Sequence, residues 1–139
     1  DRLDYTKGIV ERFRAIDRLL ATRPEWVGRF TFVQIAAPSR GMIADYRDYA
    51  ERESLDTATI AASLRKTHKA VVVDEGWKSG SLAAEVMACI VEQCFFDLDA
   101  PVARVCSEEV PIPYAKHMEE AALPQVPKIV ATVKQVLGK

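Results

Sequence analysis

Hydrophobic residues near the start of the chain recur at helical spacing. The stripe consists of residues separated by four, three and four positions, namely Ile9, Phe13, Ile16 and Leu20. This spacing is typical of a helix with one buried face. The next apolar run, 30–36, is short, aromatic and β-branched and is followed by Pro38, so it predicts a strand. We expect the core to contain Phe13, Ile16, Leu20, Phe32, Val33 and Ile35.

After residue 54 the pattern alternates between helix and strand. Asp56 is a favourable N-cap for a helix that ends near Lys69, and the run 70–74 is typical of a fully buried parallel strand. Residues 41–53 fit either a short helix or a loop. The remaining elements that the pattern predicts are a helix over 81–96, a strand over 102–106, a short helix from Tyr114 and a helix over 128–137 that Gly138 caps.

This order of elements predicts an α/β fold with three αβα layers and a small parallel sheet. Strands that alternate with helices pair in parallel through right-handed crossovers, and the helices cover both faces of the sheet. The pattern does not determine the order of the three strands. We expect residues 1–139 to form a single domain, which suits the chain length.

Composition and charge exclude several classes of partner. The chain has 19 basic and 20 acidic residues and a net charge of −1, so it lacks the basic excess that nucleic acids or anionic membranes require. No apolar run approaches the ~20 residues that span a bilayer. The first residues are too charged for a signal peptide, and we expect a cytoplasmic protein.

Cysteine and histidine spacing argues against disulfides and metal sites. The three cysteines are an odd number and lie among apolar residues, so reduced thiols are expected. His68 and His117 are far apart in sequence, and Cys89 and Cys94 do not share a helix face. We therefore expect neither a metal nor another cofactor.

Two other groups of polar residues could in principle bind a ligand or act in catalysis. Residues 75–81 (EGWKSGS) join a strand to a helix, where open α/β sheets bind ligands, but they match no phosphate-loop or dinucleotide fingerprint. Linker geometry is the favoured interpretation. The adjacent acids at 108–109 and 119–120 are expected to be solvated surface residues rather than catalytic pairs, and no catalytic residue is assigned.

The basic residues divide the chain into two parts. Before residue 54, nine of ten basic residues are arginine and Lys7 is the exception, whereas Arg65 and Arg104 are the only arginines among the nine that follow. All the cysteines and histidines also lie after residue 54. The composition therefore indicates two segments, 1–53 and 54–139.

The first segment resembles trehalose-6-phosphate synthase, a retaining glycosyltransferase with two Rossmann-like domains. The matching motifs are RLDYTKGI at 2–9 and FVQIAAPSR at 32–40. The resemblance implies that Arg2 and Lys7 bind the diphosphate of a UDP-glucose donor, and cations beside a helix N-terminus suit a diphosphate. The family's acceptor domain and ribose-binding acidic motif have no counterpart, so weak anion binding, or simply two solvated charges, is favoured over specific UDP-sugar binding.

The second segment resembles the C-terminal domain of the pyruvate dehydrogenase β subunit, which has the transketolase C-terminal fold. The matching motifs are LDTATI at 55–60, VVVDEGW at 71–77, LDAPVARV at 98–105 and VPIPYAK at 110–116. In that family thiamin diphosphate lies between other domains, and this domain contributes to subunit assembly and to docking on the acyltransferase core. The family's opening strand, helix and second strand have no counterpart here.

These observations lead to one main hypothesis and two alternatives. The main hypothesis is an artificial or recombined chimera joined near Glu53–Ser54, in which a foreign helix and strand complete the host sheet. It predicts no complete active site, no enzymatic activity and loss of the parental partners. The alternatives are an assembly and docking domain of the β-subunit type and a remnant UDP-sugar site at Arg2 and Lys7. An incomplete sheet edge also predicts a homo-oligomer.

Overall fold

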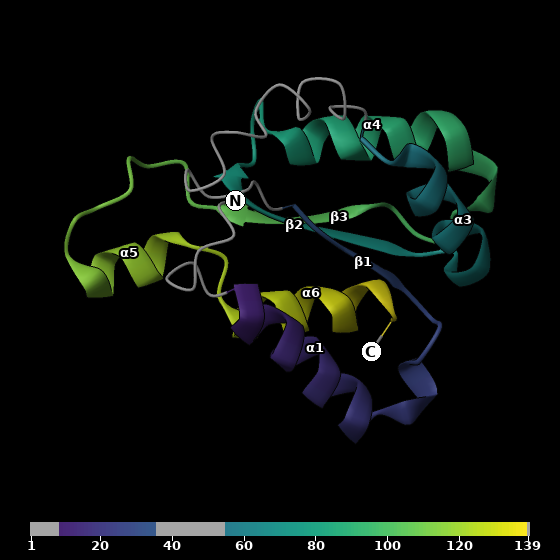
Figure 1. Ribbon diagram of the computed structural model, residues 1–139, viewed down its shortest axis with the longest axis horizontal. Helices are drawn as coiled ribbons and strands as arrows, with labels where there is room; N and C mark the ends of the chain where they lie inside the picture. The colour runs from purple at the N-terminus through teal and green to yellow at the C-terminus, as the bar shows by residue number, and fades with distance from the viewer. Residues whose placement is uncertain (1–8, 36–54, 139) are drawn as a thin grey trace, which may run out of the picture.

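Three parallel strands form one sheet at the centre of the molecule (Figure 1). The computed structural model describes residues 9–35 and 55–138. The strands are β1 (Thr31–Gln34), β2 (Ala70–Trp77) and β3 (Ala103–Ser107), in the order β1-β2-β3. The predicted small parallel sheet is confirmed, and the strand order that the sequence left open follows the order along the chain.

Helices cover both faces of this sheet. In Figure 1, α1 (Ile9–Thr22) and α6 (Val126–Val136) lie on one face, and α3 (Thr57–Thr67) and α4 (Leu82–Cys94) lie on the other. A short helix, α5 (Lys116–Ala122), lies to one side of the layers. Two 3-10 turns, η2 (Pro24–Trp26) and η4 (Phe95–Asp97), follow α1 and α4. The three-layer α/β arrangement is therefore confirmed.

The central strand β2 supplies both halves of the core. Successive side chains of a strand point to opposite faces, and the fully buried valines of β2 alternate accordingly. Val72 packs in the cluster with α3 and α4, whereas Val71 and Val73 pack in the cluster with α1 and α6. A run of apolar residues without polar alternation is expected of a strand buried on both faces.

Strand β1 pairs with β2 along its whole length. Phe32 lies beside Val71 and Val33 beside Val72. The backbone N–H of Thr31 donates to the Lys69 carbonyl at 2.7 Å, and that of Ile35 donates to the Val73 carbonyl at 3.1 Å. The expectation that the strand near residues 30–36 docks against residues 71–73 is confirmed.

The buried face of α1 differs from the predicted one. Phe13 is 53% exposed and meets only the edge of the core, with its ring 6.0 Å from that of Phe32 in an edge-to-face contact. Ile16 is buried as predicted, and the other buried positions of this helix are Arg12 and Leu19. Placing Phe13 in the core was wrong because the helix is rotated to bring Arg12 inward, where it meets a carboxylate of β2.

The ends of α3 follow the capping rules. The Asp56 carboxylate accepts a hydrogen bond from the Thr59 backbone N–H at 3.0 Å, and this bond lowers the pKa of Asp56. The helix ends at His68, whose φ of 59° is left-handed. Strand β2 extends to Trp77, beyond the predicted end, and α5 starts at Lys116 rather than Tyr114. The undecided segment 41–53 lies outside the described residues.

Candidate functional site

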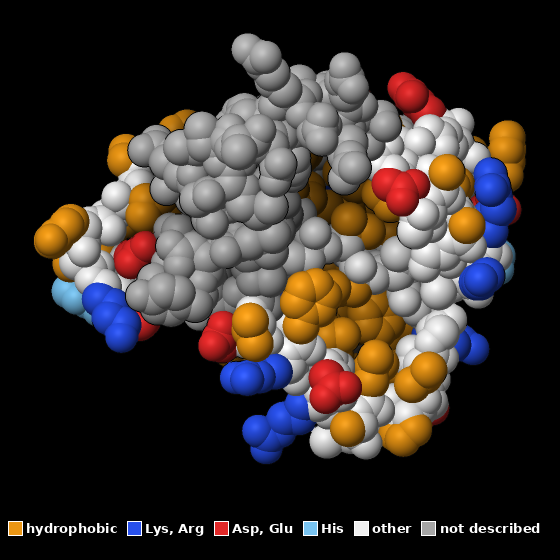
Figure 2. Space-filling view, in the orientation of Figure 1, with side chains coloured by type: hydrophobic (Ala, Val, Ile, Leu, Met, Phe, Trp, Pro, Cys, Tyr) orange, Lys and Arg blue, Asp and Glu red, His pale blue; other side chains and the backbone are white. Residues whose placement is uncertain are grey.

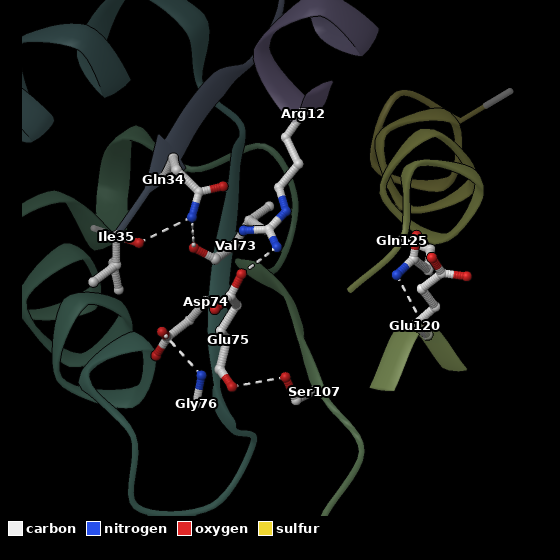
Figure 3. A network of polar contacts seen from close by, with 10 residues as sticks. All are labelled: Arg12, Gln34, Ile35, Val73, Asp74, Glu75, Gly76, Ser107, Glu120 and Gln125. Carbon is white, nitrogen blue, oxygen red and sulfur yellow. Dashed lines mark hydrogen bonds and ion pairs between the residues drawn. The ribbon is translucent and has the colours of Figure 1, made fainter. Parts of the chain in front are cut away.

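The loop between β2 and α4 is organised around a buried carboxylate. Asp74 is 5% exposed, and its Oδ1 accepts from the Gly76 backbone N–H at 3.1 Å (Figure 3). Its Oδ2 accepts from the backbone N–H of Ala83, in the first turn of α4, at 3.3 Å. A carboxylate of the protein therefore already occupies this helix N-terminus, which favours the linker interpretation of residues 75–81 over an anion site.

A buried ion pair joins α1 to the sheet. The Arg12 guanidinium donates to the Glu75 carboxylate at 2.6 Å, and the side chains are 5% and 12% exposed (Figure 3). The Ser107 hydroxyl donates to the Glu75 carbonyl at 2.7 Å, which adds β3 to the network. These contacts couple α1, β2 and β3 at the carboxyl ends of the strands, and the pairing of the two charges points to a structural role.

The adjacent glutamates at 108–109 do not act on each other. Glu108 is exposed and accepts from Lys128 at 2.8 Å, and this bond lowers the pKa of Glu108. Glu109 accepts from the backbone N–H and the hydroxyl of Ser79, at 3.0 and 2.7 Å. Each carboxylate is held by a different partner, consistent with the predicted surface role.

Histidines and cysteines occupy separate places. His68 Nδ1 lies 2.7 Å from the Asp97 carbonyl, whereas His117 is exposed. The cysteines are free thiols, and burial, reinforced by the negative charge of Asp74, raises the pKa of Cys106. Within residues 9–35 and 55–138, no three His, Cys, Asp or Glu side chains gather as metal ligands would.

An apolar groove opens beside the end of α4. Its volume is about 690 Å³, and its lining includes Met87, Val91, Phe95, Phe96, Leu98 and Pro101. Phe95 is 61% exposed and Phe96 is 98% exposed, and their rings meet edge to face at 5.3 Å. Sequence analysis missed this groove because it assigned both rings to the last turn of a helix. Two adjacent aromatics at the end of an amphipathic helix were the available signal.

The rim of the groove carries charges of both signs. The stretch 79–103 carries Glu85, Glu92, Asp97 and Asp99 and has no lysine or arginine. Asp99 lines the groove and lies 4.0 Å from Lys69, while Asp97 lies 3.5 Å from Arg65. An exposed apolar surface with a charged rim is typical of a protein docking site.

A second apolar patch lies near α1. Figure 2 shows hydrophobic side chains gathered in the middle of one face, over β1 and α1. The half-exposed Val10 and Phe13 belong to α1.

The predicted diphosphate ligands Arg2 and Lys7 lie outside the described residues, so their role stays a prediction.

The larger part of the chain matches the model of a known protein family. The model of the transketolase C-terminal domain matches residues 48–129, which include β2, β3, the helices α3, α4 and α5, and the start of α6. The chain belongs to the transketolase C-terminal domain family. The model of glycosyltransferase family 20 matches residues 1–63, which include α1 and β1. The two matches overlap at residues 48–63, which lie in the chain between the paired strands β1 and β2.

Several curated relatives carry the name of the same kind of subunit. The chain is 47% identical over 100 residues to the mitochondrial pyruvate dehydrogenase E1 component subunit beta of Drosophila melanogaster, covering 71% of this chain and 27% of that protein. It is 41% identical over 96 residues to the protein of the same name in Dictyostelium discoideum, covering 69% and 27%. The Rhizobium meliloti subunit is 34% identical over 101 residues, covering 73% and 22%. The chain spans about a quarter of the length of these relatives.

These findings correct one expectation. The expectation that the chain is not an enzyme is overturned, because its relatives are named as subunits of the pyruvate dehydrogenase E1 component, although the chain spans only part of their length. The expected junction at residues 53–54 lies within residues 48–63, where the two family matches overlap, and its position stays a prediction. The match to the Drosophila subunit covers 71% of the chain, so it also includes residues before Ser54.

None of the described helices is long and apolar enough to cross a bilayer.

Proposed function

We propose that this chain provides the C-terminal domain of a pyruvate dehydrogenase E1 β-type subunit and holds that subunit to its partners. The observation that carries this proposal is the apolar groove around Phe95 and Phe96. Its relatives are named as subunits of a larger component, and each is about four times as long as the matched region. The groove therefore faces the remainder of an E1-type assembly in this proposal.

The exposure of the two rings supports a docking role. Burying a phenylalanine side chain is worth about 1.5–3 kcal/mol, and Phe96 gains nearly the whole of this only when a partner covers it. Aromatic side chains are enriched at the centres of interfaces, and polar rims surround them. Asp99 and Lys69 supply such a polar rim beside the two rings.

A hybrid subunit tests the proposal. Residues 55–138 of this chain replace the matching C-terminal region of the Drosophila β subunit, and the hybrid is assayed for assembly with the other subunits of that component and for pyruvate decarboxylation. We expect assembly and activity. Phe96→Ser should weaken assembly about tenfold or more, because it removes a ring that docking buries.

Tyr114→Ser is the matched control, since Tyr114 is equally exposed but lies outside the groove. It should leave assembly unchanged. Circular dichroism verifies that each hybrid is folded. A folded hybrid that neither assembles nor supports activity, or a Phe96→Ser hybrid that assembles as well as the control, would contradict the proposal.

We also propose that the chain arose by joining segments of two families. The two family matches and the change from arginine to lysine support this origin. Long-read sequencing of genomic DNA and transcripts across residues 41–66 tests it, together with mass spectrometry of the peptide 8–66, which cleavage after lysine releases. A single reading frame and a detected peptide are expected. Reads that place the two segments in separate genes would contradict the joined origin.

A further inference from the structure

A second cavity lies at the carboxyl end of β3. Its volume is about 210 Å³, and it is lined by Lys78 from the β2–α4 loop, by Arg104 and Cys106 of β3, by Glu108 and Glu109 that follow, and by Lys128 of α6. Ligands of open α/β sheets bind beyond the carboxyl ends of the strands. The docking groove is a separate cavity, lined by the end of α4 and by residues that precede β3.

Three cationic residues, Lys78, Arg104 and Lys128, line this pocket. The Arg104 guanidinium donates to the Lys78 carbonyl at 2.7 Å, which fixes the loop and the guanidinium together. The Lys128 ammonium donates to the Cys106 carbonyl at 3.3 Å. Burial and Asp74 raise the pKa of the Cys106 thiol, while all three cations are close enough to oppose them. Lysine and arginine from three elements therefore surround the same space.

The carboxylates of the pocket are already engaged. Glu108 is bound to Lys128, and Glu109 is bound to the N–H and hydroxyl of Ser79. Within the part of the chain that the structure describes, neither Lys78 nor Arg104 forms an ion pair with a carboxylate. The pocket keeps a net positive charge and two cationic groups able to bind a ligand.

We propose that this pocket binds a small dianion, either inorganic phosphate or a short dicarboxylate. Arginine binds both groups through two parallel N–H donors, and the lysines add point charges. The volume of about 210 Å³ leaves room for a phosphate or a short dicarboxylate. The site is independent of the docking groove and of the E1-type assembly.

Titration of the whole chain with phosphate, with succinate and with chloride at constant ionic strength tests this proposal. Backbone amide NMR shifts of Ser107, Glu108 and Lys78 should move saturably with at least one dianion, with a Kd of about 1 mM or below, and should not move with chloride. Saturation by only one of the two dianions identifies the ligand class.

Three variants complete the test. Arg104→Gln should weaken binding about tenfold, consistent with the loss of a charge-assisted pair worth about 1.4 kcal/mol. Lys78→Ser changes an exposed residue and should weaken dianion binding several-fold. It replaces Arg104→Gln in the test if that variant does not fold. Lys134→Ser, on the same helix as Lys128 but outside the pocket, should have no effect. Shifts that never saturate, or equal affinities for all three variants, would overturn the proposal.

Discussion

The ion pair between Arg12 and Glu75 should be one of the most sensitive points of the fold. It joins a helix of the glycosyltransferase-like segment to the central strand of the transketolase-type segment. Arg12→Met leaves the Glu75 carboxylate in place with only 12% of its side chain exposed. The loss of one partner of a buried pair costs about 3–5 kcal/mol, because the remaining charge stays desolvated.

The double variant should behave differently. When Met replaces both Arg12 and Glu75, neither charge of this pair is left buried without the other, and such replacements are often neutral or stabilising by about 1–4 kcal/mol. The losses of unfolding free energy in Arg12→Met and in Glu75→Met should therefore not add up in the double variant. The coupling energy between the two residues should be about 3 kcal/mol or more. For a chain of this size a loss of 3–5 kcal/mol corresponds to a fall in Tm of about 10 °C or more.

Urea unfolding followed by circular dichroism and tryptophan fluorescence measures these energies, and the buried Trp26 beside α1 reports on this half of the core. Arg14→Met is the matched control, because Arg14 is exposed on the same helix. It should change the unfolding free energy by about 0.5 kcal/mol or less. A loss below about 1 kcal/mol for Arg12→Met, or additive single losses, would refute this account of the pair.

Four further predictions concern other parts of the chain. Phe32→Ala should cost about 2 kcal/mol because the ring is partly buried, whereas Phe13→Ala should cost less than about 1 kcal/mol, and urea unfolding compares them. Gly76→Ala should destabilise by about 1–3 kcal/mol in the same assay, since a Cβ would lie 3.0 Å from the Asp74 carboxylate and from the Ser81 Cβ. Asp56→Ala should lower Tm at neutral pH, and the difference from the parent should vanish as the pH falls through the lowered folded-state pKa and the carboxylate is protonated; differential scanning calorimetry at neutral and at strongly acidic pH tests this. UDP at millimolar concentration should produce weak, non-specific NMR shifts, and a tight saturable site abolished by Arg2→Ala would instead favour a retained donor site.

The arrangement of layers was predictable because strand and helix periodicities differ. The valine run at 71–73 and the helical spacing of Val86, Ile90 and Cys94 each indicate a buried face, and alternation of such elements allows few topologies. Asp56 identified the start of α3 through its capping chemistry. Local signals of this kind depend on neighbouring residues and are therefore visible in the sequence.

The features that escaped prediction depend on long-range contacts. Arg12 faces the core only because Glu75, far away in sequence, meets it there, and this rotation leaves Phe13 half exposed. Phe95 and Phe96 follow the apolar spacing of a helix, yet the chain turns at η4 and exposes both rings. The cation pocket likewise combines residues from the loop after β2, from β3 and from α6. A hydrophobic pattern cannot specify which polar groups meet across the fold.

The central claim is that α1 and β1 are built into the same sheet as β2 and β3. Native-state hydrogen exchange measured by NMR tests it at the backbone N–H groups of Thr31 and Ile35, which donate to the carbonyls of Lys69 and Val73. We expect these two amide protons to exchange nearly as slowly as those of Val72 and Val73, because they open with the same sheet. Exchange at Thr31 and Ile35 at the rate of an unfolded peptide, with β2 still protected, would contradict the claim.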